Sequence, residues 1–246
     1  MSSVGKEIFR TYDEFGLLQV FDDGNKRFLS FGEDDEQSCH LKSSPHQLQH
    51  DYTQAMLLVL LFCQPKKVIL FGLGGGCLAT TLHFHFPGLK LRVVELRRAV
   101  VKLAYRFFQF PRSKRIEVFT QDVGEFVDES HKKADVIFSD IYGSDGLDMQ
   151  QAQPWFIERC SELLSEDGWL VLNCWNQHRG ENDMVSSLKD YFDDVRVCST
   201  ADGNWIIFAG KKCHSVSATQ LKQSAKALSK TLGYPLTAHL ARLNII

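Results

Sequence analysis

The sequence predicts an α/β protein built on a doubly wound, mostly parallel sheet of seven strands, and two observations carry this prediction. The first is a glycine-rich loop, Gly72-Leu-Gly-Gly-Gly76, that directly follows the apolar run Val68–Phe71. An unbroken apolar run of this length is typical of a strand buried on both faces of a parallel sheet. The second is the alternation of short apolar runs with helix-forming segments from residue 68 to residue 210, which is the pattern of repeated β–α units.

This alternation divides the chain into elements with short connections. Strands are expected, with the last one antiparallel, at residues 68–71, 91–95, 116–120, 135–139, 168–173, 194–199 and 204–210. Helices are expected between them at residues 77–86, 98–108, 123–130, 153–164 and 181–191. Another helix is expected from Asp51 to Phe62, and its nearly all-round apolar surface after Gln54 indicates burial.

Two smaller units flank the segment 45–212 that holds this sheet. Residues 1–44 are expected to form a small antiparallel β subdomain, because Asp22-Asp-Gly-Asn-Lys26 separates two apolar runs and is typical of a β-hairpin turn. Residues 213–246 are expected to form a C-terminal helical extension, with helical stretches at 217–232 and 236–243. We interpret this extension as a packing arm or a partly mobile tail.

Composition excludes several classes of function. The 246 residues are 44% hydrophobic and 24% charged, as in an ordinary globular protein with a full core. The net charge of −2 gives no electrostatic case for nucleic acid or a membrane surface. The longest apolar stretch, Ala55–Cys63, is far shorter than the roughly 20 residues that span a bilayer. Seven scattered cysteines without a Cys-x-x-Cys pair predict a reduced, cytoplasmic protein, and no metal site is expected, because His83 and His85 cannot share one helix face.

The glycine loop and a downstream acid predict a nucleoside site in residues 45–212. The loop glycines let the backbone approach a ligand closely, and the first N–H groups of the next helix point at that ligand. Glu95 comes nineteen residues after Gly76, at the tip of the expected second strand, where a carboxylate accepts hydrogen bonds from a ribose diol. A tight turn beside a solvated Glu95 is the alternative, and the order of strand, loop, helix, strand and acid favours the nucleoside.

Acids also follow two later strands. Asp122 stands after the expected strand 116–120, and Asp140 stands after the expected strand 135–139. Ligands collect at the carboxyl ends of the strands in an open α/β sheet, so both acids are expected near the same ligand. Asp122 either caps the next helix or accepts from an adenine amino group. Asp140 is expected to open a loop, because Ile141-Tyr-Gly-Ser-Asp-Gly146 is rich in turn residues.

These motifs resemble the class I methyltransferase fold and, within it, the spermidine synthase (polyamine aminopropyltransferase) family. The resemblance runs from about Leu17 to Lys211 and includes the segment ending in Glu36-Gln-Ser, the glycine loop and Val94-Glu95. It implies a homodimer that takes S-adenosylmethionine or decarboxylated S-adenosylmethionine as co-substrate and an amine as acceptor. The nucleoside-binding residues that it implies are Gly72, Gly74, Gly75, Gly76, Gln54, Glu95, Leu96, Asp122 and Val123. It also implies Asp140 as the catalytic base, with Tyr142 and Asp145 at the acceptor.

Two departures separate the chain from the pattern of true spermidine synthases. The family's Gly-Gly-Gly-Asp-Gly loop has an Asp that holds the aminopropyl ammonium, and Gly75 stands at that position here. The family's second Asp, three residues after the one matching Asp140, is replaced by Gly143, and the nearest acid is Asp145. The chain is similar to a spermidine-synthase-like branch in which aminopropyl transfer and methyl transfer both fit. The competing hypothesis is a non-catalytic nucleoside- or polyamine-binding relative that has lost turnover.

Overall fold

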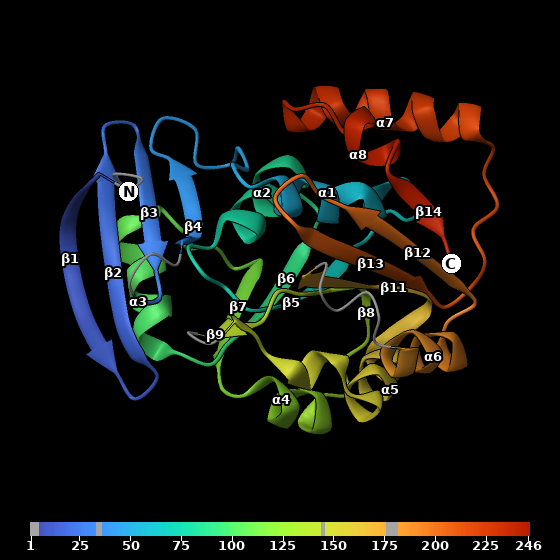
Figure 1. The fold of residues 1–246 in the computed structure, drawn as a ribbon, viewed down its shortest axis with the longest axis horizontal. Helices are drawn as coiled ribbons and strands as arrows, with labels where there is room; N and C mark the ends of the chain where they lie inside the picture. The colour runs from blue at the N-terminus through green and yellow to red at the C-terminus, as the bar shows by residue number, and fades with distance from the viewer. Residues whose placement is uncertain (1–4, 33–35, 144–145, 176–181) are drawn as a thin grey trace.

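An eight-stranded mixed sheet forms the centre of the computed structural model, which describes residues 5–32, 36–143, 146–175 and 182–246 (Figure 1). Its strand order is β14-β12-β13-β11-β8-β5-β6-β7. The parallel strands are β5 (Lys67–Phe71), β6 (Lys90–Glu95), β7 (Ile116–Thr120), β8 (Ala134–Ser139) and β11 (Leu164–Trp175). The remaining strands are β12 (Asp194–Ser199), β13 (Asn204–Gly210) and β14 (Leu243–Ile245), with β13 antiparallel to both of its neighbours.

The strand order reverses between β5 and β8. From β5 the chain moves outward to β6 and β7, and then it crosses back to place β8 on the other side of β5. At such a switch point the loops after the two central strands separate and leave a crevice for a ligand. The glycine loop follows β5 and Asp140 follows β8, so the fold brings both to this crevice.

Helices cover both faces of the sheet because side chains alternate along each buried strand. In β5, Val68 and Leu70 pack toward one helical layer, and Ile69 and Phe71 pack toward the other. The first layer contains α1 (Asp51–Met56), the 3-10 helix η1 (Leu57–Leu61), α2 (Cys77–His85), α7 (Ala218–Leu232) and α8 (Thr237–Leu240). The second layer contains α4 (Val123–Glu129), the 3-10 helix η2 (Met149–Ala152), α5 (Pro154–Leu163) and α6 (Asn182–Tyr191).

A four-stranded antiparallel sheet lies at one end of the molecule, drawn in blue in Figure 1. Its strands are β1 (Lys6–Asp13), β2 (Gly16–Asp23), β3 (Lys26–Ser30) and β4 (Glu36–Leu41). Leu18, Val20 and Leu29 are fully buried against helix α3 (Arg98–Phe107), mainly at Val100 and Leu103. Because α3 follows β6 directly, this sheet is held close to the end of β6, where Glu95 stands. A short pair, β9 (Tyr142–Gly143) and β10 (Gly146–Leu147), follows β8.

The predicted fold class is confirmed, and two details differ from the sequence-based expectation. The main sheet has eight strands rather than seven, because Leu243–Ile245, which starts at the last residue of the expected second tail helix, pairs with β12 as β14. The expected helix from Asp51 to Phe62 changes at Leu57 into 3-10 geometry, since its continuous apolar run packs on all sides. The tail packs tightly, with Ala225, Leu232 and Leu236 buried in the core. Among the described residues, no helix has the length and apolar character needed to cross a bilayer.

Candidate active site

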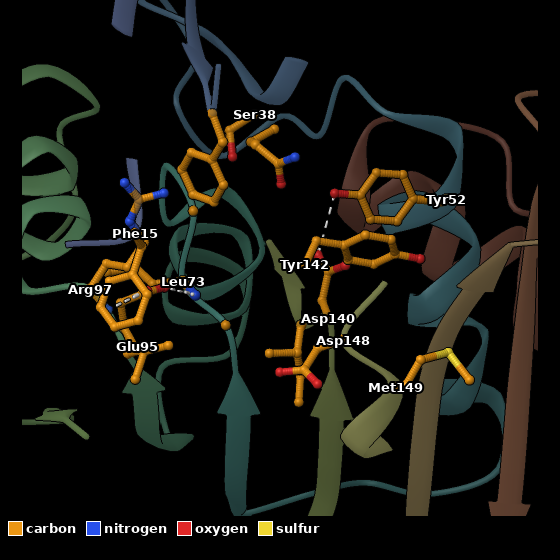
Figure 2. Close-up of a pocket in the computed structure, with 16 residues that line it drawn as sticks. Phe15, Ser38, Tyr52, Leu73, Glu95, Arg97, Asp140, Tyr142, Asp148 and Met149 are labelled. Atoms are coloured by element: carbon orange, nitrogen blue, oxygen red, sulfur yellow. Dashed lines mark hydrogen bonds between the residues drawn. The ribbon is translucent and has the colours of Figure 1, made fainter. Parts of the chain in front are cut away.

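A cavity of about 460 Å³ opens at the carboxyl ends of β5, β6 and β8, between the main sheet and the N-terminal sheet (Figure 2). Figure 2 shows two sides: Glu95, Leu73 and Arg97 lie on one, and Asp140, Tyr142 and Tyr52 on the other. The side chains and backbone that line the cavity come from Phe15, Phe31, Gln37, Ser38, Tyr52, Gly72, Leu73, Gly74, Glu95, Leu96, Arg97, Asp140, Ile141, Tyr142, Asp148 and Met149.

The glycine loop forms the floor between the two sides. Gly72 has φ of +86°, and a Cβ at this position would collide with the backbone carbonyl oxygen of Asp140. The amide of Gly72 donates to the carbonyl of Val94 (2.9 Å), and the amide of Asp140 donates to the carbonyl of Phe71 (2.9 Å). The loop after β5 is therefore packed directly against the loop after β8, and only glycine fits that contact.

Glu95 is the polar group on the first side. Its side chain is buried at the tip of β6, where Oε2 accepts from the amide of Leu73 (2.9 Å) and Oε1 accepts from the amide of Arg97 (2.9 Å). Burial raises the pKa of the Glu95 carboxyl, and these backbone donors lower it in part. A carboxylate oxygen can accept two hydrogen bonds, so both Glu95 oxygens remain able to accept from the hydroxyls of a ribose.

The N-terminal sheet closes this side. Arg97 forms a bidentate pair with Asp13, with Nη2 2.6 Å from Oδ1 and Nε 3.0 Å from Oδ2. The Arg97 guanidinium also lies over the ring of Phe31, 4.7 Å from its centre. Phe15 and Phe31 thereby present an apolar aromatic wall beside Glu95, which suits a planar base next to a ribose.

Asp140 is the centre of the second side. Asn173 Nδ2 donates to its Oδ1 (2.8 Å), and the Tyr52 hydroxyl donates to its Oδ2 (3.3 Å). Burial raises the pKa of the Asp140 carboxyl, while the two donors lower it in part. A carboxylate with a raised pKa is a better proton acceptor than a solvated one, provided that it is ionised at the working pH.

Tyr142, Asp148 and Met149 complete the second side. The Tyr142 hydroxyl donates to the carbonyl of Asn173 (3.2 Å), and Asp148 Oδ1 accepts from the amide of Gln150 (2.9 Å). With Glu95 and Asp140, three carboxylates line the cavity. Among the described lining residues Arg97 is the only cation, and Asp13 compensates its charge. The cavity therefore favours a cationic ligand.

Six of the residues expected at the site line this cavity: Gly72, Gly74, Glu95, Leu96, Asp140 and Tyr142. Gly75 and Gly76 face away from it, since a Cβ would meet Phe108 at 2.9 Å from Gly75 and Phe110 at 2.7 Å from Gly76. An aspartate at position 75 would therefore need Phe108 to move.

The other expected residues lie outside the lining. The Gln54 amide donates to the carbonyl of Leu48 (2.9 Å), and Gln54 is not among the residues that line the cavity. Asp122 caps α4, with Oδ1 accepting from the amides of Gly124 (2.7 Å) and Glu125 (3.3 Å). Val123 is buried in the core between α4 and the sheet. Asp145 lies outside the described residues.

Tyr52 and Asp148 were missed by the sequence-based reasoning. Tyr52 precedes the expected contact Gln54 by two residues, and the helical geometry of α1 turns the tyrosine toward Asp140 while it turns the glutamine away. Asp148 belongs to a short 3-10 segment without a periodic signal. Ser38, in contrast, ends the Glu36-Gln-Ser segment that carries part of the family resemblance. Its hydroxyl accepts from the amide of Gly75 (2.8 Å).

No three His, Cys, Asp or Glu side chains come together as a metal-binding group in the part of the chain that the structure describes.

The sequence matches the family described as "Methyltransferase small domain" over residues 47–208. A polyamine aminopropyltransferase from Neisseria meningitidis is 28% identical over 236 residues, which cover 93% of this chain and 89% of that protein. The eEF1A lysine and N-terminal methyltransferase of Bos taurus is 30% identical over 190 residues, covering 72% of this chain and 27% of that protein. Human methyltransferase-like protein 13, solved in complex with SAH, superposes with a TM-score of 0.70 at 23% identity, covering 76% of this chain and 94% of that one. The expected resemblance to both kinds of transferase is confirmed.

Proposed function

The chain belongs to the methyltransferase small domain family, and we propose that it transfers an alkyl group from an S-adenosylmethionine-type nucleoside to an amine. The observation that carries this proposal is that Glu95, the glycine loop and Asp140 line one cavity of about 460 Å³. That volume lies within the range of small-molecule sites. Glu95 holds the ribose, the wall formed by Phe15 and Phe31 holds the adenine, and the sulfonium faces Asp140. The free oxygen of the Asp122 cap is proposed to accept from the adenine amino group.

The reaction is a displacement at a carbon bonded to the sulfonium. The amine lone pair forms a new N–C bond, the C–S bond breaks, and its electron pair stays on sulfur, which leaves a neutral thioether. The nitrogen loses a proton to Asp140, and Tyr52 and Asn173 hold the two carboxylate oxygens in place for that transfer. Because the sulfonium is a good leaving group, in-line positioning supplies much of the rate.

The two candidate donors differ in the group that they transfer and in their charge. S-adenosylmethionine adds a carboxylate, which the three cavity carboxylates disfavour, and decarboxylated S-adenosylmethionine lacks it. The loop, however, has Gly75 where the synthases place the Asp that holds the aminopropyl ammonium. The donor is therefore left as an S-adenosylmethionine-type nucleoside, and the acceptor as an amine. A polyamine acceptor, a cytoplasmic location and a homodimer are parts of the same proposal.

Isothermal titration with S-adenosylmethionine, its decarboxylated form and methylthioadenosine tests the proposal. We expect at least one of these to bind with a dissociation constant in the micromolar range. Tighter binding of the decarboxylated donor supports aminopropyl transfer, and tighter binding of S-adenosylmethionine supports methyl transfer. Mass spectrometry of reactions with a panel of di- and polyamines then detects the product. Binding without any product would favour the non-catalytic relative, and no binding at all would contradict the proposed function.

A further inference from the structure

The two side chains that bind the Asp140 carboxylate, Tyr52 and Asn173, are both connected to Asp51, the first residue of helix α1. Tyr52, which donates to Oδ2 of Asp140, directly follows Asp51 in α1. Asn173, which donates to Oδ1 of Asp140, has its own Oδ1 bonded by Asn204 Nδ2 (3.0 Å). Tyr52 and Asn173 are thus fixed by elements that meet at Asp51.

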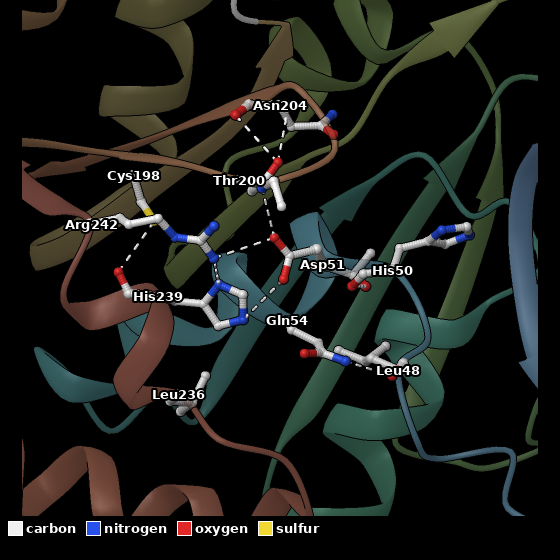
Figure 3. Close-up of polar contacts among 12 residues, drawn as sticks. Leu48, His50, Asp51, Gln54, Cys198, Thr200, Asn204, Leu236, His239 and Arg242 are labelled. Carbon is white, nitrogen blue, oxygen red and sulfur yellow. Dashed lines mark hydrogen bonds and ion pairs between the residues drawn. The ribbon is translucent and has the colours of Figure 1, made fainter.

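The turn between β12 and β13 connects Asn204 to Asp51 (Figure 3). Thr200 and Asn204 bond each other across this turn, with Thr200 N 2.9 Å from the Asn204 carbonyl and Asn204 N 3.0 Å from Thr200 Oγ1. The next residue, Ala201, donates its amide to Asp51 Oδ2 (3.0 Å). Asp51 therefore fixes the turn that orients Asn204, in addition to starting the helix that carries Tyr52.

Asp51 is in turn held by the C-terminal tail. Arg242 Nη2 lies 3.3 Å from Asp51 Oδ2, and His239 Nε2 lies 3.6 Å from Asp51 Oδ1 (Figure 3). Arg242 Nη2 also lies 3.0 Å from His239 Nδ1. Because a guanidinium has no acceptor, Nδ1 must accept this bond, so the neutral imidazole carries its proton on Nε2, facing Asp51. His239 is only 2% exposed, and burial lowers its pKa, which favours this neutral form.

We propose that the C-terminal tail, through Arg242 and His239, positions the catalytic base by holding Asp51. The inference rests on the proposed function, since it concerns the same base. The tail reaches Asp140 by two routes: through Asp51 to Tyr52 along α1, and through Ala201, Asn204 and Asn173 across the sheet. Arg242, His239 and Asp51 are positioning residues, because their side chains stand outside the cavity lining.

The test compares Arg242→Ala with Leu228→Ala. Leu228 packs α7 on the core, so its truncation removes apolar packing of the tail and leaves the polar contacts of Arg242 and His239 with Asp51 in place. We expect Arg242→Ala to lower kcat about tenfold, because displacing a reacting group by about 1 Å can cost about 100-fold. The dissociation constant of the donor should stay within about twofold, since Glu95 and the glycine loop are not on the route. Leu228→Ala should lower Tm about as much as Arg242→Ala does, and it should leave kcat unchanged.

A second readout does not need turnover. Carbon-13 NMR of the Asp140 carboxyl should show a higher pKa in Arg242→Ala than in the wild type, because loosened Tyr52 and Asn173 no longer favour the ionised form. Tyr52, Tyr142, Asp148 and Glu95 line the cavity with Asp140, and Cys77 borders Asp140 from α2. Burial raises the pKa of both phenols and of the Cys77 thiol, so these three groups stay neutral in this range. Asp51→Asn, which keeps an acceptor for Ala201, should shift the Asp140 pKa in the same direction if Arg242→Ala does not fold.

An unchanged Asp140 pKa in both variants would overturn the inference, as would equal loss of kcat in Arg242→Ala and Leu228→Ala. If the wild type binds no donor and forms no product, the proposed function fails. The NMR shift still decides whether the tail positions Asp140.

Discussion

The two sides of the cavity are built in different ways. On the first side, which we propose holds the nucleoside (the nucleoside side), the glycine loop and Glu95 come from one β–loop–helix–β unit, and the amides of Leu73 and Arg97 bind the carboxylate within that unit. On the second side, which we propose meets the acceptor (the acceptor side), Asp140 is held by Tyr52, 88 residues away, and by Asn173, 33 residues away. The carboxylate and loop of the nucleoside side form a local motif, to which the N-terminal sheet adds the wall of Phe15 and Phe31. The acceptor side is held entirely by contacts between segments that are distant in sequence.

This difference indicates which part of the site is free to vary. A local motif binds the part that the candidate donors share, the adenosine. In the proposed function, the acceptor side meets the part that differs between aminopropyl and methyl transfer. There this chain departs from the synthase pattern at Gly143, whereas the departure at Gly75 lies in the glycine loop of the nucleoside side. Substitutions should therefore separate the two sides. Changes on the acceptor side should affect turnover, and changes on the nucleoside side should affect donor binding.

The largest effect is expected for Asp140→Asn. The amide keeps the size of the side chain and an acceptor for Asn173, but it cannot take a proton, so kcat should fall by about 10²–10⁴-fold. Donor affinity by isothermal titration should change little, because the variant leaves the nucleoside side intact. The acidic limb of the rate–pH profile that Asp140 sets in the wild type should also disappear. Full turnover in Asp140→Asn would show that another group accepts the proton.

Glu95→Gln should give the complementary result. Loss of a charge-assisted hydrogen bond costs about 1.5–3 kcal/mol, so the dissociation constant of the donor should rise about 10- to 100-fold. At saturating donor, kcat should stay near the wild-type value. Glu117→Gln, a change in the neighbouring strand β7 outside the cavity lining, is the matched control and should leave the affinity unchanged. Equal affinity in Glu95→Gln and the control would remove Glu95 from the site.

Asp122→Ser separates two roles on the nucleoside side. Serine keeps an N-cap acceptor for α4, so Tm should stay near the wild-type value, whereas Asp122→Ala should lose about 1 kcal/mol of stability. If the second carboxylate oxygen takes the adenine amino group, the donor dissociation constant should rise several-fold in both variants. Wild-type affinity in Asp122→Ser would leave the residue with the capping role alone.

The smallest effect concerns stability. Burial raises the pKa of Asp140 in the folded state, so its ionised form opposes folding at neutral pH. Asp140→Asn should therefore raise Tm at neutral pH, where each kcal/mol gained appears as about 2–4 °C in a chain of this size. The gain should shrink as pH falls through the raised pKa and vanish below about pH 4, where the carboxyl is protonated in both states. A constant gain across pH would assign the effect to packing.

The sequence predicted the nucleoside side of the site better than the acceptor side. The loop and Glu95 were found because their spacing reflects one β–α–β unit, and the mostly parallel sheet followed from repeated β–α pairs. Tyr52 could not be found, since nothing in its local pattern shows that the start of α1 lies beside Asp140. The role of Asp122 as a cap and as a ligand could not be separated, because one residue type serves both.

The tail shows the same limit. The helix expected at residues 236–243 is present as α8 over Thr237–Leu240, but its last residue, Leu243, begins a strand that pairs with β12. The contacts of Arg242 and His239 with Asp51 join residues about 190 positions apart, which no local pattern encodes.

The central claim is that the two sides of the cavity hold a single S-adenosylmethionine-type nucleoside between them. A crystal structure with methylthioadenosine tests it most directly. We predict ribose hydroxyls within hydrogen-bonding distance of the Glu95 carboxylate, the base against Phe15 and Phe31, and the sulfur facing Asp140. Methylthioadenosine bound at another place, or in this cavity with its ribose away from Glu95, would contradict the account.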